Sequence, residues 1–462
     1  MLFTCFFYIE NLLHLCFTKS VNKKNLTMNN LNKPRFIISA LLLISITIVV
    51  FNNLEASSVF FSSTQLAISE YLGWFIILTA NGFLIFSTYL LFTKYKHIKL
   101  GGASALPSYT YTNWIAMLFS AGLGIGLLFY GVAEPIGNLN DYPEMIENNV
   151  SYNAGKALSL TNLHWGLHGW AVYASLGLCF AFSSYNKNKA FRVSSLLGES
   201  VEKNKPLAAT IDIIAILTTV TGIATSLGLG ASQINGGLDH VFDIKLNEFI
   251  IIIFITLLGL ISVCLGLDAG IKRLSQLNMF IAILLLITVL ALGPTIFILN
   301  AMVQNAGAYL NQIIQLSSWT EAYNDTVYQN GYTLFYFTWW FAWAPFVSLF
   351  IARISYGRTI KEFIIGVLFV PSLIVFIWMG VFGNAAIYQV LNNIGDISGA
   401  VSQNASTALF VLYDSMSLSM VLSSVSLILI VTFFVTSSDS GALVASMLSS
   451  KKGADIDGDS PL

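Results

Sequence analysis

Charged residues are scarce in this chain. Lys and Arg number 22, and Asp and Glu number 23, so that 10% of the 462 residues are charged. A soluble domain carries about 25%, and so few charges would leave large apolar patches on a soluble surface. The net charge of −1 also provides no electrostatic footprint for nucleic acid. This composition excludes a soluble enzyme, a disordered protein and a nucleic-acid-binding domain.

Cysteine is scarce too, and the apolar runs do not alternate with polar residues. The four cysteines form no CxxC pair and no metal-binding spacing, so neither a disulfide framework nor a cofactor site is implied. A β-barrel is disfavoured because its strands would alternate, whereas the apolar runs here are continuous. With 56% hydrophobic residues and a mean hydropathy of +0.74, the chain is predicted to be an all-α polytopic membrane protein.

Ten apolar runs approach or exceed the roughly 20 residues that a transmembrane helix needs. They cover residues 36–54, 71–93, 113–133, 157–183, 208–237, 247–266, 278–300, 330–353, 362–390 and 420–447.

The basic residues orient these runs. Every Lys and Arg except Lys156 and Lys245 lies before the first run or after an even-numbered one. The positive-inside rule therefore places the N-terminus and the even-numbered loops in the cytoplasm, with the protein in the inner (plasma) membrane. The loops expected outside are mildly acidic and hold Glu134, Asp141, Glu144, Glu147, Glu321 and Asp325.

The third run contains three glycines within five residues, Gly122, Gly124 and Gly126. A nucleotide-binding loop is excluded because no Lys-Ser/Thr pair follows and no strand precedes. Two interpretations stay open. Gly122 and Gly126 form a GxxxG pair suited to close helix packing. Alternatively, the helix is locally unwound and its carbonyl groups face a cavity, as in transporters that bind cations near the midplane.

The fourth run carries three large amphipathic rings, those of Trp165, Trp170 and Tyr173. They fit an interfacial aromatic belt, or a box of π faces, which attracts quaternary ammonium groups. His164 and His168 have the i, i+4 spacing of metal ligands, but no third ligand accompanies them.

The eighth run holds a third of the chain's nine tryptophans within five residues: Trp339, Trp340 and Trp343. An interfacial belt would explain one or two of them. Pro345 lies inside the same run and predicts a broken helix. Arg353 and Arg358 follow, and we expect them to be cytoplasmic gate or anchor residues.

The tenth run ends in hydroxyl groups that surround Asp439: Thr436, Ser437, Ser438 and Ser440. An ionisable side chain at membrane depth indicates function by default, and hard oxygen ligands suit a small cation such as sodium. In the alternative interpretation the hydroxyls bond to their own helix and Asp439 lies near the cytoplasmic end.

Together these segments resemble the betaine/carnitine/choline transporter (BCCT) family from about residue 36 to the end. The resemblance is carried by GLGIGLLFYGVAEP, HWGLHGWAVYA, GIATSLGLGASQINGGL (222–238), GLDAGIKRLSQLN (266–278), WWFAWAPFVSLFIARISYGRT and VTSSDSGALV. Their order and spacing agree with the family.

The resemblance implies a protein of twelve helices. Two extra N-terminal helices precede a leucine-transporter-like core of two inverted five-helix repeats, and the protein assembles as a homotrimer in the lipid bilayer. On this basis we expect a cytoplasmic segment at 1–35, two peripheral helices at 36–93, the first repeat at 113–300, an extracellular connection at 301–329, three helices of the second repeat at 330–450, and a cytoplasmic end at 451–462.

Both ends depart from the family pattern. Residues 1–27 are interpreted as an upstream extension, because Met28 opens a more ordinary start, and a weak interfacial segment is the alternative. The family continues for two more helices and a charged tail after the tenth run. We therefore expect a C-terminally truncated member with ten of the twelve helices, and a non-functional truncated copy stays a possible alternative.

The resemblance implies secondary active transport, not an enzymatic reaction. The expected activity is sodium-coupled symport of glycine betaine, a quaternary ammonium solute used in osmoprotection. The matching substrate positions are Gly124, Trp165, Trp170, Tyr173 and Trp340, with Trp343 on the cytoplasmic side of the pathway. The matching sodium ligands are the carbonyl groups of Ser120, Leu123 and Phe433 and the hydroxyls of Thr436 and Ser437.

Two features of the sequence bear on the substrate and the coupling ion. Choline-type members tend to carry Asp at the position of Gly126, and sodium-independent members tend to place a basic side chain in the ion site. The third, fifth and tenth runs contain no basic residue. Both features favour sodium and betaine over proton-coupled or exchange transport of choline or carnitine, which stays the alternative. A channel or a sensor of the same fold is a further hypothesis.

Overall fold

The structure is a computed structural model in which every described regular element is a helix, apart from two isolated β-bridges. This confirms the predicted all-α class. Our expectations for residues 1–27, and for nearly all of 451–462, lie outside the described part. The described residues are 31–147, 149–269 and 271–451, without the side chains of 263–269.

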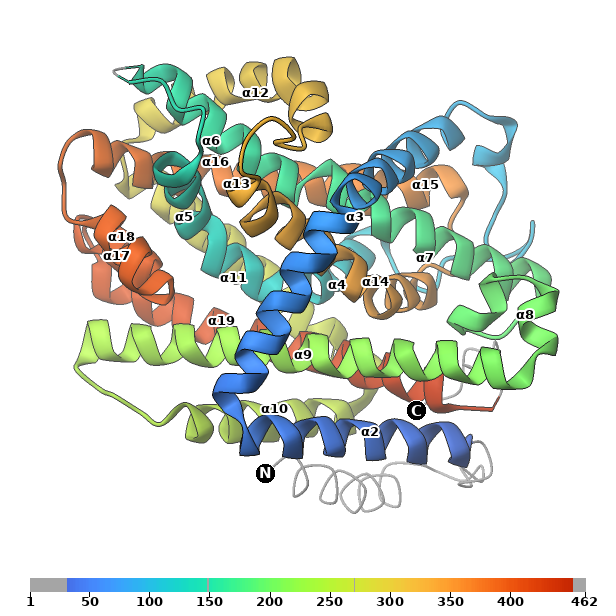
Figure 1. Ribbon diagram of the computed structural model, residues 1–462. Helices are drawn as coiled ribbons and strands as arrows, with labels where there is room; N and C mark the ends of the chain where they lie inside the picture. The colour runs from blue at the N-terminus through green and yellow to red at the C-terminus, as the bar shows by residue number, and fades with distance from the viewer. Residues whose placement is uncertain (1–30, 148, 270, 452–462) are drawn as a thin grey trace.

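A helix or an interrupted helix occurs at each of the ten predicted spans (Figure 1). Uninterrupted ones are α2 (Lys33–Asn52), α3 (Leu54–Leu90), α9 (Lys205–Phe242), α10 (Glu248–Ala269), α11 (Ile271–Leu292) and α19 (Ser419–Ser449). Interrupted ones are α4 (Tyr111–Gly122) with α5 (Gly124–Asp141), α6 (Val150–Trp165) with α7 (Leu167–Lys187), α13 (Val327–Gly331) with α14 (Thr333–Ile354), and α15 (Ile360–Ile364) with a π turn and α16 (Val370–Leu391).

Length and composition show which of these helices could cross a bilayer. Among the described residues, seven helical segments are long and apolar enough to cross a bilayer, and the bent pair α4–α5 would make an eighth. The helix ends follow local signals. Asn32 and Asn204 accept backbone N–H groups at the starts of α2 and α9, and a proline lies in the first turn of each helix.

The connection after α11 differs from our expectation. Gly293 and Pro294 end α11 at Leu292, before the predicted boundary at residue 300. Residues 301–318 of the expected connection belong to the helix α12 (Thr295–Ser318). Its buried Asn305 donates to the side-chain oxygen of Asn384 on α16. Hydropathy alone missed this boundary because apolar residues continue past the proline.

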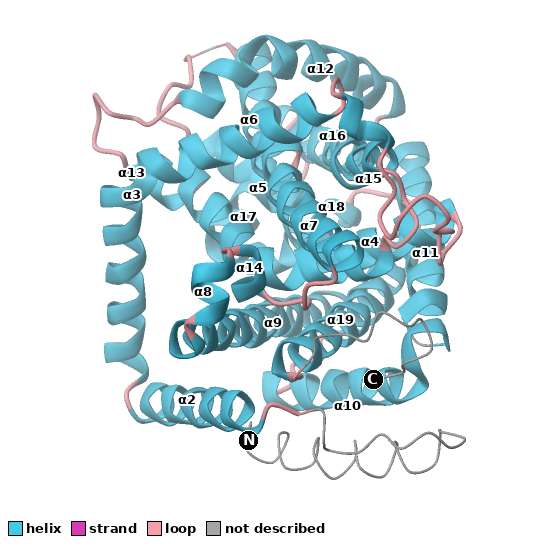
Figure 2. Cartoon of the chain, turned by 90° about the vertical axis from the view of Figure 1, so that its right-hand side faces the viewer, coloured by secondary structure: helices cyan, strands magenta, loops and turns pink. Residues whose placement is uncertain are grey.

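The central helices carry the pocket described below. α7 packs against α14, α9 against α19, and α5 against α16. Short helices α8 (Glu199–Lys203), α17 (Ile397–Asn404) and α18 (Ala408–Asp414) lie in the connections. By contrast, α2 and α3 stand at the edge of the bundle (Figure 2). They expose large apolar side chains such as Phe60 and Trp74, as lipid-facing helices do.

Candidate functional site

The third predicted span is broken at Leu123. α4 ends at Gly122, α5 begins at Gly124, and the two helices are bent by 61°. The glycines also allow close packing, because a Cβ atom at Gly122 would lie 2.8 Å from the ring of Trp170 and one at Gly126 would lie 2.5 Å from Trp165. Both interpretations of the glycine-rich segment therefore apply.

The fourth predicted span is also broken, which the sequence reading did not anticipate. Gly166 separates α6 from α7, and a Cβ atom there would lie 2.4 Å from the carbonyl oxygen of Asn162. This contact makes glycine necessary at the break. Nearby, the carbonyl oxygen of His164 accepts the indole N–H of Trp340 at 2.8 Å. The second break thus holds a tryptophan of α14 in place.

The predicted break of the eighth span at Pro345 is wrong. α14 runs without interruption from Thr333 to Ile354, with Pro345 inside it. A proline removes one helical hydrogen bond, and a helix packed among others can tolerate that loss. The interruption lies instead at Tyr332, between α13 and α14, where the backbone has φ −114° and ψ −80°.

A pocket lies between the break at Leu123 and the aromatic side chains of α6, α7 and α14. We call it the aromatic pocket. None of the described residues that line it is charged. Its lining consists of residues 121–126 with Trp165, Tyr173, Ser226, Tyr336, Trp339, Trp340, Trp343 and Ser437. Of the predicted substrate positions, Gly124, Trp165, Tyr173, Trp340 and Trp343 are therefore brought together here.

Trp170, the remaining predicted box residue, lies behind the pocket. It is fully buried, and its ring centroid lies 5.7 Å from that of Tyr173 and 5.8 Å from that of Trp340. The rings of Tyr173 and Trp340 are 4.8 Å apart, and a Cβ atom at Gly169 would lie 2.2 Å from Trp340. Rings in such contact leave no space between them, so a ligand would reach them from the side of the Leu123 break.

Sequence reasoning missed part of this pocket. Tyr336 and Trp339 line it, and Tyr130 lies behind Trp165 with ring centroids 5.3 Å apart. Tyr336 and Trp339 are one helical turn apart on α14, so helical periodicity starting from Trp339 could have found Tyr336.

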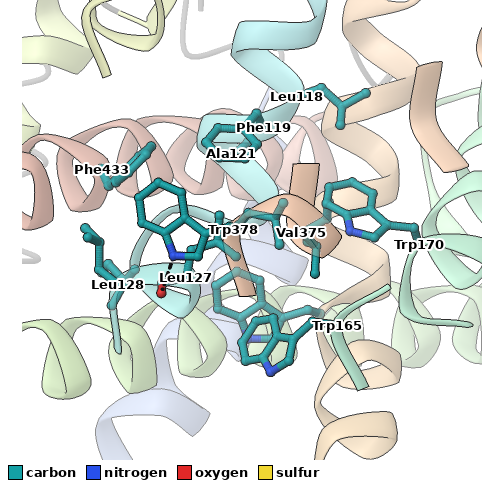
Figure 3. Close-up of a cluster of buried hydrophobic side chains, with 14 of the residues drawn as sticks. Leu118, Phe119, Ala121, Leu127, Leu128, Trp165, Trp170, Val375, Trp378 and Phe433 are labelled. Atoms are coloured by element: carbon teal, nitrogen blue, oxygen red, sulfur yellow. Dashed lines mark hydrogen bonds between the residues drawn. The ribbon is translucent and has the colours of Figure 1, made fainter. Parts of the chain in front are cut away.

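Buried side chains of neighbouring helices surround the broken helix α4–α5 and hold it in position (Figure 3). Trp378 on α16 donates its indole N–H to the carbonyl oxygen of Leu127 at 3.0 Å, and Gln233 on α9 donates to that of Leu128 at 2.9 Å. These two bonds attach the first turns of α5 to two neighbouring helices. The start of α5 is thereby fixed to α16 and α9 about one turn after the break.

Glu134 was expected in an outside loop, and this expectation is wrong. Glu134 lies on α5 and is 2% exposed. Its carboxylate accepts the indole N–H of Trp165 and lies 2.6 Å from Nδ1 of His164. The other ring nitrogen of His164 lies 3.0 Å from the hydroxyl of Thr333. The third apolar run was predicted to end at residue 133, but the helix continues to Asp141.

The five predicted sodium ligands lie on α4, α19 and the break between α4 and α5. The hydroxyl of Ser437 donates to the carbonyl oxygen of Ser120 at 3.3 Å. Thr436 instead donates to the carbonyl of Phe433 at 2.8 Å, within its own helix, as the alternative interpretation expected. Leu123 is the residue at the break. The end of α4 and the middle of α19 thus meet at Ser120 and Ser437.

The two arginines after α14 take different positions. Arg358 donates to the carbonyl oxygen of Tyr109 at 2.6 Å, and its guanidinium lies 4.9 Å from the ring centroid of Trp114. Burial lowers the pKa of Arg358, and the charge of Glu362 opposes that shift. Arg353 accepts the hydroxyl proton of Tyr185 at its carbonyl oxygen. Arg358 therefore acts as an anchor that joins the chain ahead of α4 to the end of α14.

Comparison with known proteins agrees with the resemblance. The chain is 42% identical to a glycine betaine transporter of Bacillus subtilis, over 84% of this chain and 77% of that protein. It is 37% identical to a glycine betaine transporter of Acinetobacter baylyi, over 91% of this chain. A glycine betaine/proline/choline/ectoine transporter of Vibrio parahaemolyticus is 39% identical over 84% of this chain.

The chain spans 65% of the length of the Acinetobacter relative and 70% of the Vibrio relative. Residues 34–459 match the family described as betaine/carnitine/choline family transporter. This match covers nearly all of the chain and includes both broken helices and the aromatic pocket. The chain therefore belongs to the betaine/carnitine/choline transporter family.

Proposed function

We propose that the protein is a secondary active transporter for the uptake of quaternary ammonium compatible solutes, most specifically a sodium-coupled glycine betaine symporter. The observation that carries this proposal is the aromatic pocket beside the broken helix α4–α5. Its described lining offers six aromatic rings and no charged group. Such a lining favours a bulky cationic head through cation–π contacts, each contributing roughly 0.5–2 kcal/mol.

The relatives support the substrate class, since three of them are named glycine betaine transporters or include glycine betaine in their names. The packing around Gly126 supports betaine over choline. A Cβ atom at this position would already lie 2.5 Å from Trp165, so an Asp would displace that ring. Among the described pocket residues there is also no basic side chain to replace a coupling cation.

The mechanism that we propose is alternating access. Sodium binds between the Leu123 break and the hydroxyl of Ser437, where the carbonyl of Ser120 is already in reach at 3.3 Å. Binding there holds α19 against α4 while the trimethylammonium head contacts Trp165, Tyr173 and Trp340. Opening of the cytoplasmic side then releases both. The N-terminus would lie in the cytoplasm of the inner membrane, and the protein would assemble as a homotrimer.

Uptake of labelled glycine betaine by the full chain in proteoliposomes tests the proposal. We expect saturable uptake driven by an inward sodium gradient. Loss of a desolvated cation–π contact of about 2 kcal/mol in Trp340→Ala should raise KM roughly 30-fold. Trp74→Ala is the matched control, because Trp74 on α3 is 59% exposed to the surrounding lipid.

Three results would contradict parts of the proposal. Unaltered uptake in Trp340→Ala would exclude the aromatic pocket as the substrate site. Uptake at the same rate without sodium would exclude sodium coupling and favour the proton-coupled or exchange alternatives. Ionic current far above the turnover of a carrier would indicate a channel.

A further inference from the structure

A second polar group lies within the helix bundle, two residues along α19 from Ser437 of the aromatic pocket. Asp439 on α19 is 2% exposed, ten residues before the helix ends at Ser449, which corresponds to about 15 Å along the axis. The hydroxyl of Ser262 on α10 donates to its Oδ2 atom. The other carboxylate oxygen, Oδ1, is buried and has no hydrogen-bond partner among the described residues. A buried carboxylate with a free oxygen needs a further partner.

The neighbouring helix α11 supplies candidate partners. α11 and α19 run antiparallel, because Gly293 after the end of α11 lies near Met416 before the start of α19, whereas Asn278 contacts Thr436 further along. In an antiparallel pair, a residue one turn earlier on α11 than Asn278 lies opposite a residue one turn later on α19 than Thr436. Ser275 is therefore placed at the level of Asp439.

The side chains of Asn278 and Ser275 on α11 are both buried, and each has an oxygen atom without a hydrogen-bond partner among the described residues. Asn278 donates its amide N–H to Oγ1 of Thr436 at 3.3 Å, and Thr436 uses its own proton on the carbonyl of Phe433. This chain of bonds fixes the amide so that Oδ1 of Asn278 is the free atom. The hydroxyl of Ser275 is buried and, within the described part of the chain, has no hydrogen-bond partner either.

We propose that Asp439, Ser262, Asn278 and Ser275 form a binding site for a monovalent cation of the sodium type between α10, α11 and α19. The ligand atoms are one carboxylate, one amide oxygen and two hydroxyls, which are the hard donors that such an ion prefers. A single carboxylate matches a single positive charge. Among the described residues, none of the ion pairs involves Asp439, so a bound cation would be its neutralising partner.

This site adjoins the sodium site proposed beside Ser437, since Asn278 bonds to Thr436, one of the ligands predicted for that site, but its carboxylate faces another helix. Residues two apart on a helix point to opposite sides. Ser437 accordingly bonds to α4, whereas Asp439 bonds to α10. A role of the second site in coupling rests on the proposed transport function, but cation binding to it can be measured without transport.

Binding of radioactive sodium to the purified full chain in detergent tests the inference. Asp439→Asn keeps the size of the side chain and an oxygen for the Ser262 hydroxyl, and it should bind one sodium ion fewer per chain than the unaltered protein. Asn278→Ala should weaken the same binding event roughly 10–100-fold. Ser437→Ala is the matched control, which should affect only the other site.

Unchanged sodium stoichiometry and affinity in Asp439→Asn would overturn the inference. Loss of sodium binding in Ser437→Ala, with none in Asp439→Asn, would overturn it as well. Elution on size exclusion and retained binding at the Ser437 site show that the variant is folded. Failure of betaine uptake in the unaltered protein, with Asp439-dependent sodium binding intact, would contradict the proposed function alone. Normal uptake together with Asp439-independent binding would contradict this inference alone.

Discussion

Ser437 on α19 donates its hydroxyl proton to the backbone carbonyl oxygen of Ser120 on α4. The bond crosses from one helix to another just before the break at Leu123, where the backbone leaves the regular helical path. A hydroxyl and a carbonyl oxygen that already face each other can both turn toward an ion. The contact therefore links the broken helix to the helix that packs beside it.

Ser437→Ala should raise the sodium concentration needed for half-maximal uptake at least about tenfold, because one oxygen ligand to a charged group contributes roughly 1.5–3 kcal/mol. The measurement is betaine uptake at varied sodium and saturating betaine. Ser424→Ala on the same helix is the control, since its exposed hydroxyl bonds only to the carbonyl of Met420. An unchanged sodium dependence in Ser437→Ala would argue against this ion site.

Glu134→Gln should weaken substrate binding although Glu134 does not line the aromatic pocket. The carboxylate accepts from Trp165 and faces Nδ1 of His164, whereas an amide would present N–H groups to one of these donors. An unsatisfied buried donor costs about 1–3 kcal/mol. We expect a raised KM for betaine with Trp165 displaced, and lower quenching of tryptophan fluorescence by the substrate.

The exposed Glu70 on α3 provides the control for this prediction. Glu70→Gln should leave both KM and fluorescence unchanged. If Glu134→Gln lowered only the amount of folded protein, with KM unaltered, then Glu134 would be a stabilising residue and would not position the pocket.

The positions of the spans could be predicted because a helix is buried in lipid through its apolar residues, and runs of such residues are visible in the sequence itself. The three glycines had two interpretations, close helix packing and a local break of the helix, and the sequence could not choose between them. Both apply in the structure, where the helix is broken at Leu123 and the glycines also allow close packing. The end of α11 was misplaced because Pro294 stops a helix without lowering the hydropathy around it.

The positions of buried polar groups could not be predicted in the same way. Glu134 was placed in a loop because the apolar run was predicted to end at residue 133. Its burial depends on donors from His164 and Trp165, which are about thirty residues away and meet it only in the folded bundle. Likewise, the break at Gly166 needs glycine because an added Cβ atom would lie 2.4 Å from the carbonyl oxygen of Asn162, and this requirement has no counterpart in a hydropathy pattern.

Gly169→Ala should disturb the aromatic pocket through one methyl group. A Cβ atom at this position would lie 2.2 Å from the ring of Trp340, closer than any real contact, so the ring must move. We expect betaine uptake to fall severalfold. Gly82→Ala on α3 has nothing within 4 Å of the added carbon, and it should leave uptake unchanged. Equal activity of the two variants would show that the position of Trp340 does not matter for uptake.

Arg358→Lys should lower the stability of the protein by about 1–2 kcal/mol, since a lysine loses the planar stacking on Trp114 and the directed bond to the carbonyl of Tyr109. The measurement is the midpoint of thermal unfolding of the purified full chain. The exposed Arg273 at the start of α11 gives the control, because Arg273→Lys keeps the charge and loses no such contact. If both variants unfold at the temperature of the unaltered protein, the Arg358 contacts do not anchor α14 to the segment ahead of α4. A lower midpoint in Arg358→Lys alone shows that the fork of the guanidinium, and not only its charge, joins these two segments.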